Sequence, residues 1–78
     1  MNNKIKVAVV TLGDSRKEFF LSRINIVNDE LQKLKETLGE KYDLYMPDIV
    51  YDIEEGQMAS DEIIKRGIKS VIIHIPLW

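Results

Sequence analysis

The chain has 78 residues, of which 45% are hydrophobic and 31% charged, with a formal net charge of -2 at pH 7. This length allows one domain with a small core, and the composition is typical of a globular protein rather than a disordered one. The slightly acidic balance gives no long-range attraction for nucleic acid or acidic membranes. With no cysteine and one histidine, the sequence excludes disulfides, thiolate chemistry and a His-rich metal site.

The first predicted element is a strand over residues 5–12, an apolar, β-branched run of the kind found in buried parallel strands. The hydrophobic period then changes to that of an amphipathic helix, with apolar residues spaced by four and three at Phe20, Ile24, Val27, Leu31, Leu34 and Leu38. Ser15 and Glu18 fit a capping box at the start of this helix, and Gly39 supplies a left-handed turn at its end. We therefore expect one continuous helix between Ser15 and Gly39.

The second half of the chain repeats the strand and helix pattern. An extended segment from Leu44 to Val50 is interrupted by Pro47, which cannot donate to a strand ladder and so predicts a sheet edge. Asp52 begins a second helix that ends at Gly67, with an apolar face formed by Ile53, Gly56, Ala59, Ile63 and Ile64. A third, almost wholly apolar strand follows over residues 70–75.

This β-α-β-α-β order predicts a three-layer α/β domain with a parallel sheet in the order 2-1-3 and one helix on each face. The strand at residues 5–12 is then central. The strand at residues 70–75 becomes a bare apolar edge unless another strand or chain covers it. Because no signal peptide or long apolar run is present, we expect a soluble, cytoplasmic location.

In such a sheet, ligands bind in the crevice between the carboxyl ends of the first and third strands. The first strand leads into Gly13, Asp14, Ser15 and Arg16, and the third into Trp78. An arginine there can hold a sugar hydroxyl or a carboxylate through its forked donors, and a tryptophan can stack on a sugar ring or anchor an interface. The same residues also fit a plain turn, a cap and a solvated arginine. Neither a P-loop nor a dinucleotide fingerprint is present.

Other titratable residues predict no separate site. His74 lies among Ile and Val residues, where we expect a hydrogen-bonded core histidine rather than a ligand. We interpret five acids as the solvated side and start of the second helix rather than a metal site, because hard cations need converging oxygens: Asp52, Glu54, Glu55, Asp61 and Glu62. A phospho-acceptor site is excluded, because the third strand ends in Ile75-Pro76 rather than an aspartate.

The run Val-Thr-Leu-Gly-Asp-Ser-Arg before a long helix, Asp52 at the second helix start and the closing Ile-Pro-Leu-Trp resemble the amino-terminal domain of the L-fucose isomerase family. L-arabinose isomerases share the general layout. The resemblance spans essentially the whole chain. It implies the first portion of a longer enzyme, a Rossmann-like or flavodoxin-like domain that binds no nucleotide, and a homo-oligomer whose subunits complete each other's active sites. It also implies that Arg16 and Trp78 contact the substrate.

The family's reaction is aldose–ketose isomerisation assisted by a manganese-type divalent ion, whose carboxylate ligands belong to later domains. We therefore expect no catalytic residue, metal or cofactor in these 78 residues, and an isolated chain that is catalytically inert. Two alternatives remain. A stand-alone interaction or regulatory module would assemble through the third strand with Phe19 and Ile26, and a small phosphosugar or nucleotide carrier would bind phosphate at residues 13–16.

Overall fold

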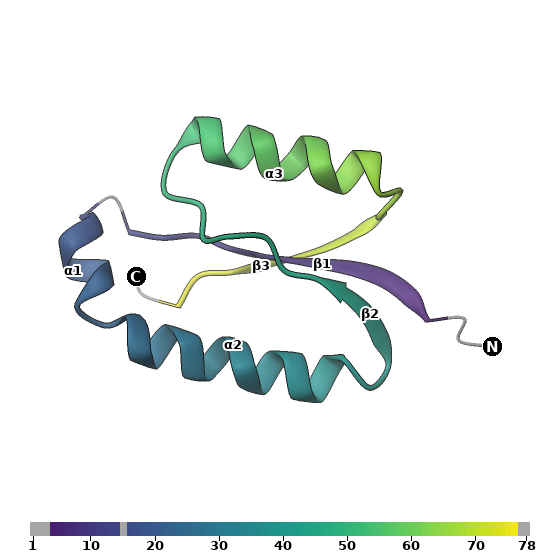
Figure 1. The fold of residues 1–78 in the computed structure, drawn as a ribbon, viewed down its shortest axis with the longest axis horizontal. Helices are drawn as coiled ribbons and strands as arrows, with labels where there is room; N and C mark the ends of the chain where they lie inside the picture. The colour runs from purple at the N-terminus through teal and green to yellow at the C-terminus, as the bar shows by residue number, and fades with distance from the viewer. Residues whose placement is uncertain (1–3, 15, 77–78) are drawn as a thin grey trace.

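The computed structural model describes residues 4–14 and 16–76 and contains one three-layer α/β unit (Figure 1). Three parallel strands form the sheet in the order β2-β1-β3, as the sequence predicts. Helices α2 and α3 lie on opposite faces of this sheet (Figure 1). The strands are β1 (Ile5–Thr11), β2 (Tyr42–Tyr45) and β3 (Ser70–His74), and the helices are α1 (Lys17–Leu21), α2 (Ile24–Leu38) and α3 (Ile53–Lys65).

Strand β1 is central, and its residues 7–11 are buried because helices cover both faces of the sheet there, while Ile5 and Lys6 are exposed. Alternate side chains point to opposite faces. Ala8 and Val10 join the cluster beneath α3, which also holds Val50, Ala59, Ile63 and Ile68. Val9 and Thr11 point to the α2 face, where Phe20 and Val27 are fully buried. The predicted apolar face of α3 is narrower than expected, since Ile53 and Ile64 are exposed.

The prediction of one continuous helix is wrong, because the chain breaks at Ser22 and Arg23 into α1 and α2. The Ser22 hydroxyl donates to the Phe19 carbonyl at 2.6 Å, and the Arg23 amide bonds three residues back to Phe20 at 3.0 Å. A serine that bonds back to its own helix competes with the regular ladder and bends it. Helix α1 therefore turns away from α2 (Figure 1), and Phe20 meets the edge of Tyr51 with ring centroids 5.5 Å apart.

The predicted ends of the first helix also differ. Arg16 occupies the N-cap position of α1 and makes no side-chain capping bond, while Ser15, the predicted cap, lies outside the described residues. Gly39 does end α2, but its φ of -64° is right-handed, so the predicted left-handed turn is wrong. A Cβ atom at Gly39 would collide with the Lys35 carbonyl oxygen. Close approach, rather than positive φ, therefore favours glycine at this position.

Strand β2 is shorter than predicted. Its ladder ends at Tyr45, and the chain pairs again with the end of β1 and the residues after it at an isolated bridge between Leu12 and Val50. Pro47 lies between these two contacts, where no ladder bond is required of it. The edge position of β2 is confirmed, but the predicted extension of the strand to Val50 is wrong. Strand β3 likewise ends at His74, one residue before the predicted end.

Helix α3 begins and ends as the sequence predicts. The Asp52 carboxylate accepts the Glu55 amide at 2.8 Å, and the Glu55 carboxylate accepts the Tyr51 amide at 2.7 Å. Gly67 follows the helix with a φ of 71°, the left-handed conformation that glycine adopts without strain. Within the described residues, no helix has the length and apolar character needed to cross a bilayer.

Candidate functional site

The candidate site lies beyond the carboxyl end of β1, where Gly13 and Asp14 lead toward α1 (Figure 1). The Gly13 amide donates to the Val50 carbonyl at 2.7 Å, which holds the loop against the segment after β2. A Cβ atom at Gly13 would lie 2.5 Å from two ring atoms of Tyr51. Its φ is not in the left-handed region. Glycine is therefore required here because the Tyr51 ring leaves no room for a side chain.

Asp14 and Arg16 form the best-defined polar contact of the site. The Asp14 carboxylate accepts the Arg16 amide at 2.7 Å, Nε at 3.1 Å and Nη2 at 2.8 Å. This is a forked pair that also closes a local turn, because the same carboxylate holds both the backbone and the side chain of Arg16. The Asp14 side chain is 12% exposed and that of Arg16 69% exposed. The aspartate is thus a support, and the arginine is the surface group.

The electrostatics of the pair follow from this geometry. Hydrogen bonds from the Arg16 side chain, and then from its amide, lower the pKa of Asp14 from 3.8 to about 2. Reciprocally, the hydrogen bond to Asp14 raises the pKa of Arg16. Asp14 is therefore ionised at neutral pH and is poorly suited to donate or accept a proton as a catalytic group. Its role is to fix the guanidinium.

The guanidinium of Arg16 also stacks on an aromatic ring. Its Cζ atom lies 4.5 Å from the centroid of Phe19, and the Cζ atom of Arg23 lies 4.3 Å from the same centroid. Lys17 lies over Tyr51 at 4.7 Å. Three cations thus gather around α1 on two aromatic rings. With Nε–H and one N–H of Nη2 held by Asp14, the two N–H groups of Nη1 and the second one of Nη2 remain to donate to hydroxyl or carboxylate oxygens of a ligand.

The second predicted contact, Trp78, lies outside the described residues. The predicted convergence of Arg16 with Trp78 therefore stays a prediction. The described chain continues from β3 through Ile75 to Pro76, so the end of β3 can be compared with that of β1. Thr11 pairs with His74 in the ladder, and both strands end at the same edge of the sheet.

Sequence reasoning missed a hydrogen-bonded chain across three elements. The Thr11 hydroxyl lies 3.2 Å from Nδ1 of His74, and Nε2 of His74 lies 3.0 Å from the Glu30 carboxylate. Both ring nitrogens of the histidine are thus partnered, in line with the interpretation of His74 as a hydrogen-bonded core residue. Thr11 is buried, which keeps a substrate from reaching its hydroxyl. The chain therefore ties α2 to β1 and β3 rather than forming a nucleophile.

The acidic residues of α3 have local partners. Asp52 and Glu55 bond backbone amides at the helix start, and Glu62 pairs with Arg66 at 2.8 Å. Across residues 4–14 and 16–76, no three His, Asp or Glu side chains come together as a metal site would require. The described residues therefore do not fit the divalent ion that the resemblance to sugar isomerases implies.

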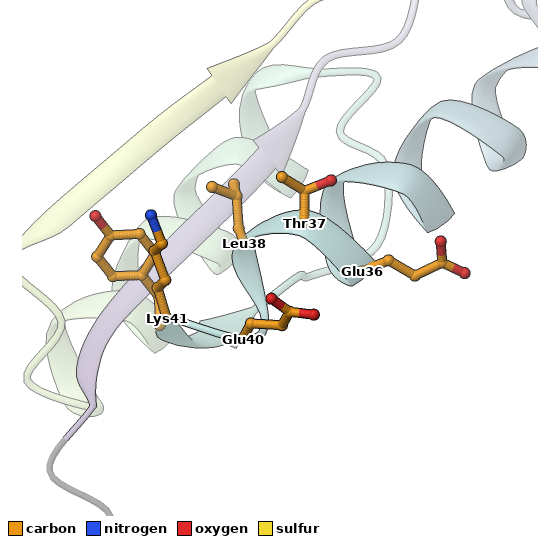
Figure 2. A pocket seen from close by; sticks show the side chains of 6 residues that line it. Glu36, Thr37, Leu38, Glu40 and Lys41 are labelled. Carbon is orange, nitrogen blue, oxygen red and sulfur yellow. The ribbon is translucent and has the colours of Figure 1, made fainter.

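Arg16 lines none of three surface hollows found among the described residues. One of about 510 Å³ is formed where α2 turns into β2, at the opposite end of the molecule from α1 (Figure 1). Figure 2 shows Glu36 near the end of α2, and Glu40 and Lys41 in the turn that follows. Its walls come from one short segment, residues 36–42, and it is open to solvent. It lacks the convergence of several elements that is typical of a ligand site.

Several features of the site had a weak sequence signal. Asp14 and Arg16 have the spacing of a side-chain turn, and Phe19 and Arg23 follow at three and seven residues from Arg16. The contact of Tyr51 with Gly13, and that of His74 with Glu30, had none, because both join residues distant in the chain. Comparison with family models, curated proteins and solved structures gave no match to this chain.

Proposed function

We propose that this chain is the cytoplasmic, sugar-contacting amino-terminal part of an aldose–ketose isomerase of the L-fucose isomerase type. The proposal combines the motifs of the sequence with a position that suits them. A supported arginine lies beyond the carboxyl end of the central parallel strand, the edge at which open α/β sheets bind ligands. In this reading the chain binds and encloses the sugar, while the metal and the proton-transferring carboxylates belong to other parts of the enzyme.

The observation that carries the proposal is the held guanidinium of Arg16. Two hydrogen bonds to Asp14 fix the plane of the guanidinium. The aromatic ring of Phe19 lies against the guanidinium and gives it an apolar neighbour. A side chain fixed before binding loses less conformational entropy when a ligand arrives. Its remaining donors match the hydroxyl oxygens of a sugar, which accept hydrogen bonds along one edge of the ring. Trp78 would complete the contact by stacking, as the resemblance implies.

The test is a titration of the 78-residue chain with L-fucose and L-arabinose, followed by the amide chemical shifts of residues 13–16. We expect Arg16→Ala to weaken sugar binding by at least about tenfold, because hydrogen bonds from a charged donor are lost. Arg66→Ala is the matched control, since Arg66 also pairs with a carboxylate and lies 4.1 Å from the ring centroid of Tyr45. Equal sugar affinity in the Arg16→Ala chain and the unchanged chain would refute the proposed contact.

Inorganic phosphate serves as the second ligand in the same titration. A phosphosugar carrier would show larger shifts at residues 13–16 with phosphate than with neutral sugars. A sugar-contacting domain would show the reverse order. The comparison separates the two readings without depending on catalysis, and we expect no conversion of either sugar by the isolated chain.

A further inference from the structure

The outer edge of β3 is an apolar and exposed feature of the described residues. Within residues 4–14 and 16–76, β3 pairs with β1 on one side and with no strand on the other. Four large apolar residues are exposed along it and just after it, namely Val71 at 45%, Ile72 at 39%, Ile73 at 54% and Ile75 at 48%. Proteins ordinarily protect such edges with charge, proline or a covering element.

The other edge of the sheet is protected in that way. Strand β2 has four residues, one of them the exposed Asp43, and Pro47 follows soon after its end. It offers a short and interrupted ladder. Strand β3 contains no Asp, Glu, Lys or Arg, and its His74 is engaged by Glu30. Any strand that adds to this sheet is therefore expected at β3.

Independently of the proposed function, we propose that in the 78-residue chain β3 pairs with β3 of a second copy, antiparallel and about a two-fold axis at Ile73, to form a continuous six-stranded sheet. The backbone sets which groups are available. The His74 carbonyl faces β1, since it accepts the Leu12 amide at 2.9 Å. Backbone groups alternate in direction along a strand of a parallel ladder, so the amides and carbonyls of Val71 and Ile73 face the open edge.

With a two-fold axis at Ile73, the backbone amides and carbonyls that face the open edge bond to those of the second copy. Ile73 then faces Ile73 of the second copy as a hydrogen-bonded pair, and Val71 faces Ile75. Both pairs lie on the α3 face, because Ile73 and Val71 are in register with Val10 and Ala8. On the α2 face, Ile72 lies opposite His74. The apolar residues that are exposed in one copy thus cover those of the other.

Charges on α2 favour the same register. Glu30 and Lys33 line the side of α2 toward β3, where they form part of a shallow groove of about 350 Å³ that ends at His74. Glu30 is level with His74, because the two side chains are 3.0 Å apart. Lys33 lies three residues further along α2, or about 4.5 Å nearer the amino edge of the sheet. The midpoint between these charges is therefore about 2 Å from the level of His74, closest to Ile73.

Rotation about an axis at that level brings Glu30 of each copy to the level of Lys33 of the other. The rims of the two α2 helices then present opposite charges to one another, which supports a second copy as the occupant of this edge. A two-fold interface of this kind is closed, so assembly stops at the dimer. The outer edges of the six-stranded sheet are then the two protected β2 strands.

Sedimentation of the 78-residue chain over a wide concentration range is the first test, with a monomer–dimer equilibrium expected. Ile73→Lys should raise the dimer dissociation constant at least about tenfold, because a charge enters an apolar edge. Ile64→Lys makes the same change on α3, where Ile64 is 73% exposed, and should leave the constant unchanged. A monomer at every concentration, open-ended oligomers or equal effects of the two variants would overturn the proposal.

Lys33→Glu and Lys35→Glu form a second matched pair on α2. Only Lys33 lines the groove beside β3, so only its reversal should weaken the dimer, and this difference should shrink with added salt. An equal effect of both variants contradicts the proposed alignment of α2 with its copy.

Single cysteines test the register directly, because the chain has no cysteine of its own. Ile73→Cys should cross-link to itself on oxidation or with a short thiol cross-linker, since the Cα atoms of a hydrogen-bonded antiparallel pair lie about 5.5 Å apart. Val71→Cys should not, because its own copy lies four residues along the partner strand. Efficient cross-linking of Val71→Cys, or none for Ile73→Cys where the dimer is populated, would refute the Ile73-centred pairing.

Discussion

Gly13 shows how one missing side chain positions the candidate site. Its Cα faces the Tyr51 ring so closely that a methyl group would lie 2.5 Å from two ring carbons. Tyr51 in turn contacts Phe20 and lies beneath Lys17. The loop after β1 is thus packed against Tyr51, which contacts the buried Phe20 of the core and also lies beside Lys17 at the candidate site.

We expect Gly13→Ala to lower the free energy of unfolding by about 1–3 kcal/mol, as is usual when a group is forced into a packed position. Gly56→Ala is the control, because a Cβ atom there would lie at an ordinary 3.6 Å from Val50. As a helix position, Gly56 should gain about 0.5–1 kcal/mol from alanine. Urea unfolding measures both changes, and destabilisation of similar size in the two variants would contradict the role of the Tyr51 ring.

Asp14 gives a pH-dependent prediction at the same scale. Because its pKa in the folded chain is lowered to about 2, the pair with Arg16 stabilises the fold above the ordinary value of 3.8. This contribution is lost as the pH falls from about 3.8 through about 2. We expect Arg16→Ala to return the pKa of Asp14 toward 3.8, with Arg66→Ala as the control. A carboxyl-carbon NMR titration measures the shift, and an unchanged Asp14 midpoint would show that Arg16 is not its cause.

At the scale of the elements, the amphipathic period identified the helical region but concealed the break in it. Phe20, Ile24 and Val27 keep helical spacing on both sides of the break, so hydrophobic periodicity alone predicts one helix. The departure depends on the Ser22 hydroxyl, which bonds to the Phe19 carbonyl. Serine makes such bonds in some helices and not in others, and here the break accompanies the contact of Phe20 with Tyr51.

Helix α3 was predicted with better boundaries, because its signals are local. Asp52 and Glu55 satisfy backbone amides within four residues, and Gly67 adopts the positive φ expected of it. Strand β2 was predicted in part. Pro47 correctly predicts an edge, while the length of the ladder depends on where β1 and the loop before α3 meet again, at Leu12 and Val50.

We expect Asp52→Ala to destabilise the chain by about 1 kcal/mol, the typical cost of removing an N-cap. Asp61→Ala, in the exposed middle of α3, removes the same charge without removing a cap and should cost less. Thermal unfolding of the two variants provides the measurement. The prediction fails if Asp61→Ala is as destabilising as Asp52→Ala.

For the whole molecule, the strand order was predictable because the β-α-β-α-β pattern and right-handed crossovers leave few arrangements. The position of Arg16 at the carboxyl edge follows from that order. Its orientation does not, since it depends on the conformation by which Asp14 turns back to hold it. Contacts such as His74 with Glu30 need the register of β1 and β3 and the rotation of α2, which no short motif encodes.

The central position of β1 has a consequence for the order of events during synthesis. Val7 pairs with Ser70 and Thr11 with His74, so β1 leaves the ribosome 63 residues ahead of the strand that pairs with it. Parallel pairing across such long separations is slow to form, because the intervening chain must be closed first. The apolar β1 segment therefore stays without one of its two neighbours until β3 emerges, a period in which a chaperone would find it an accessible target.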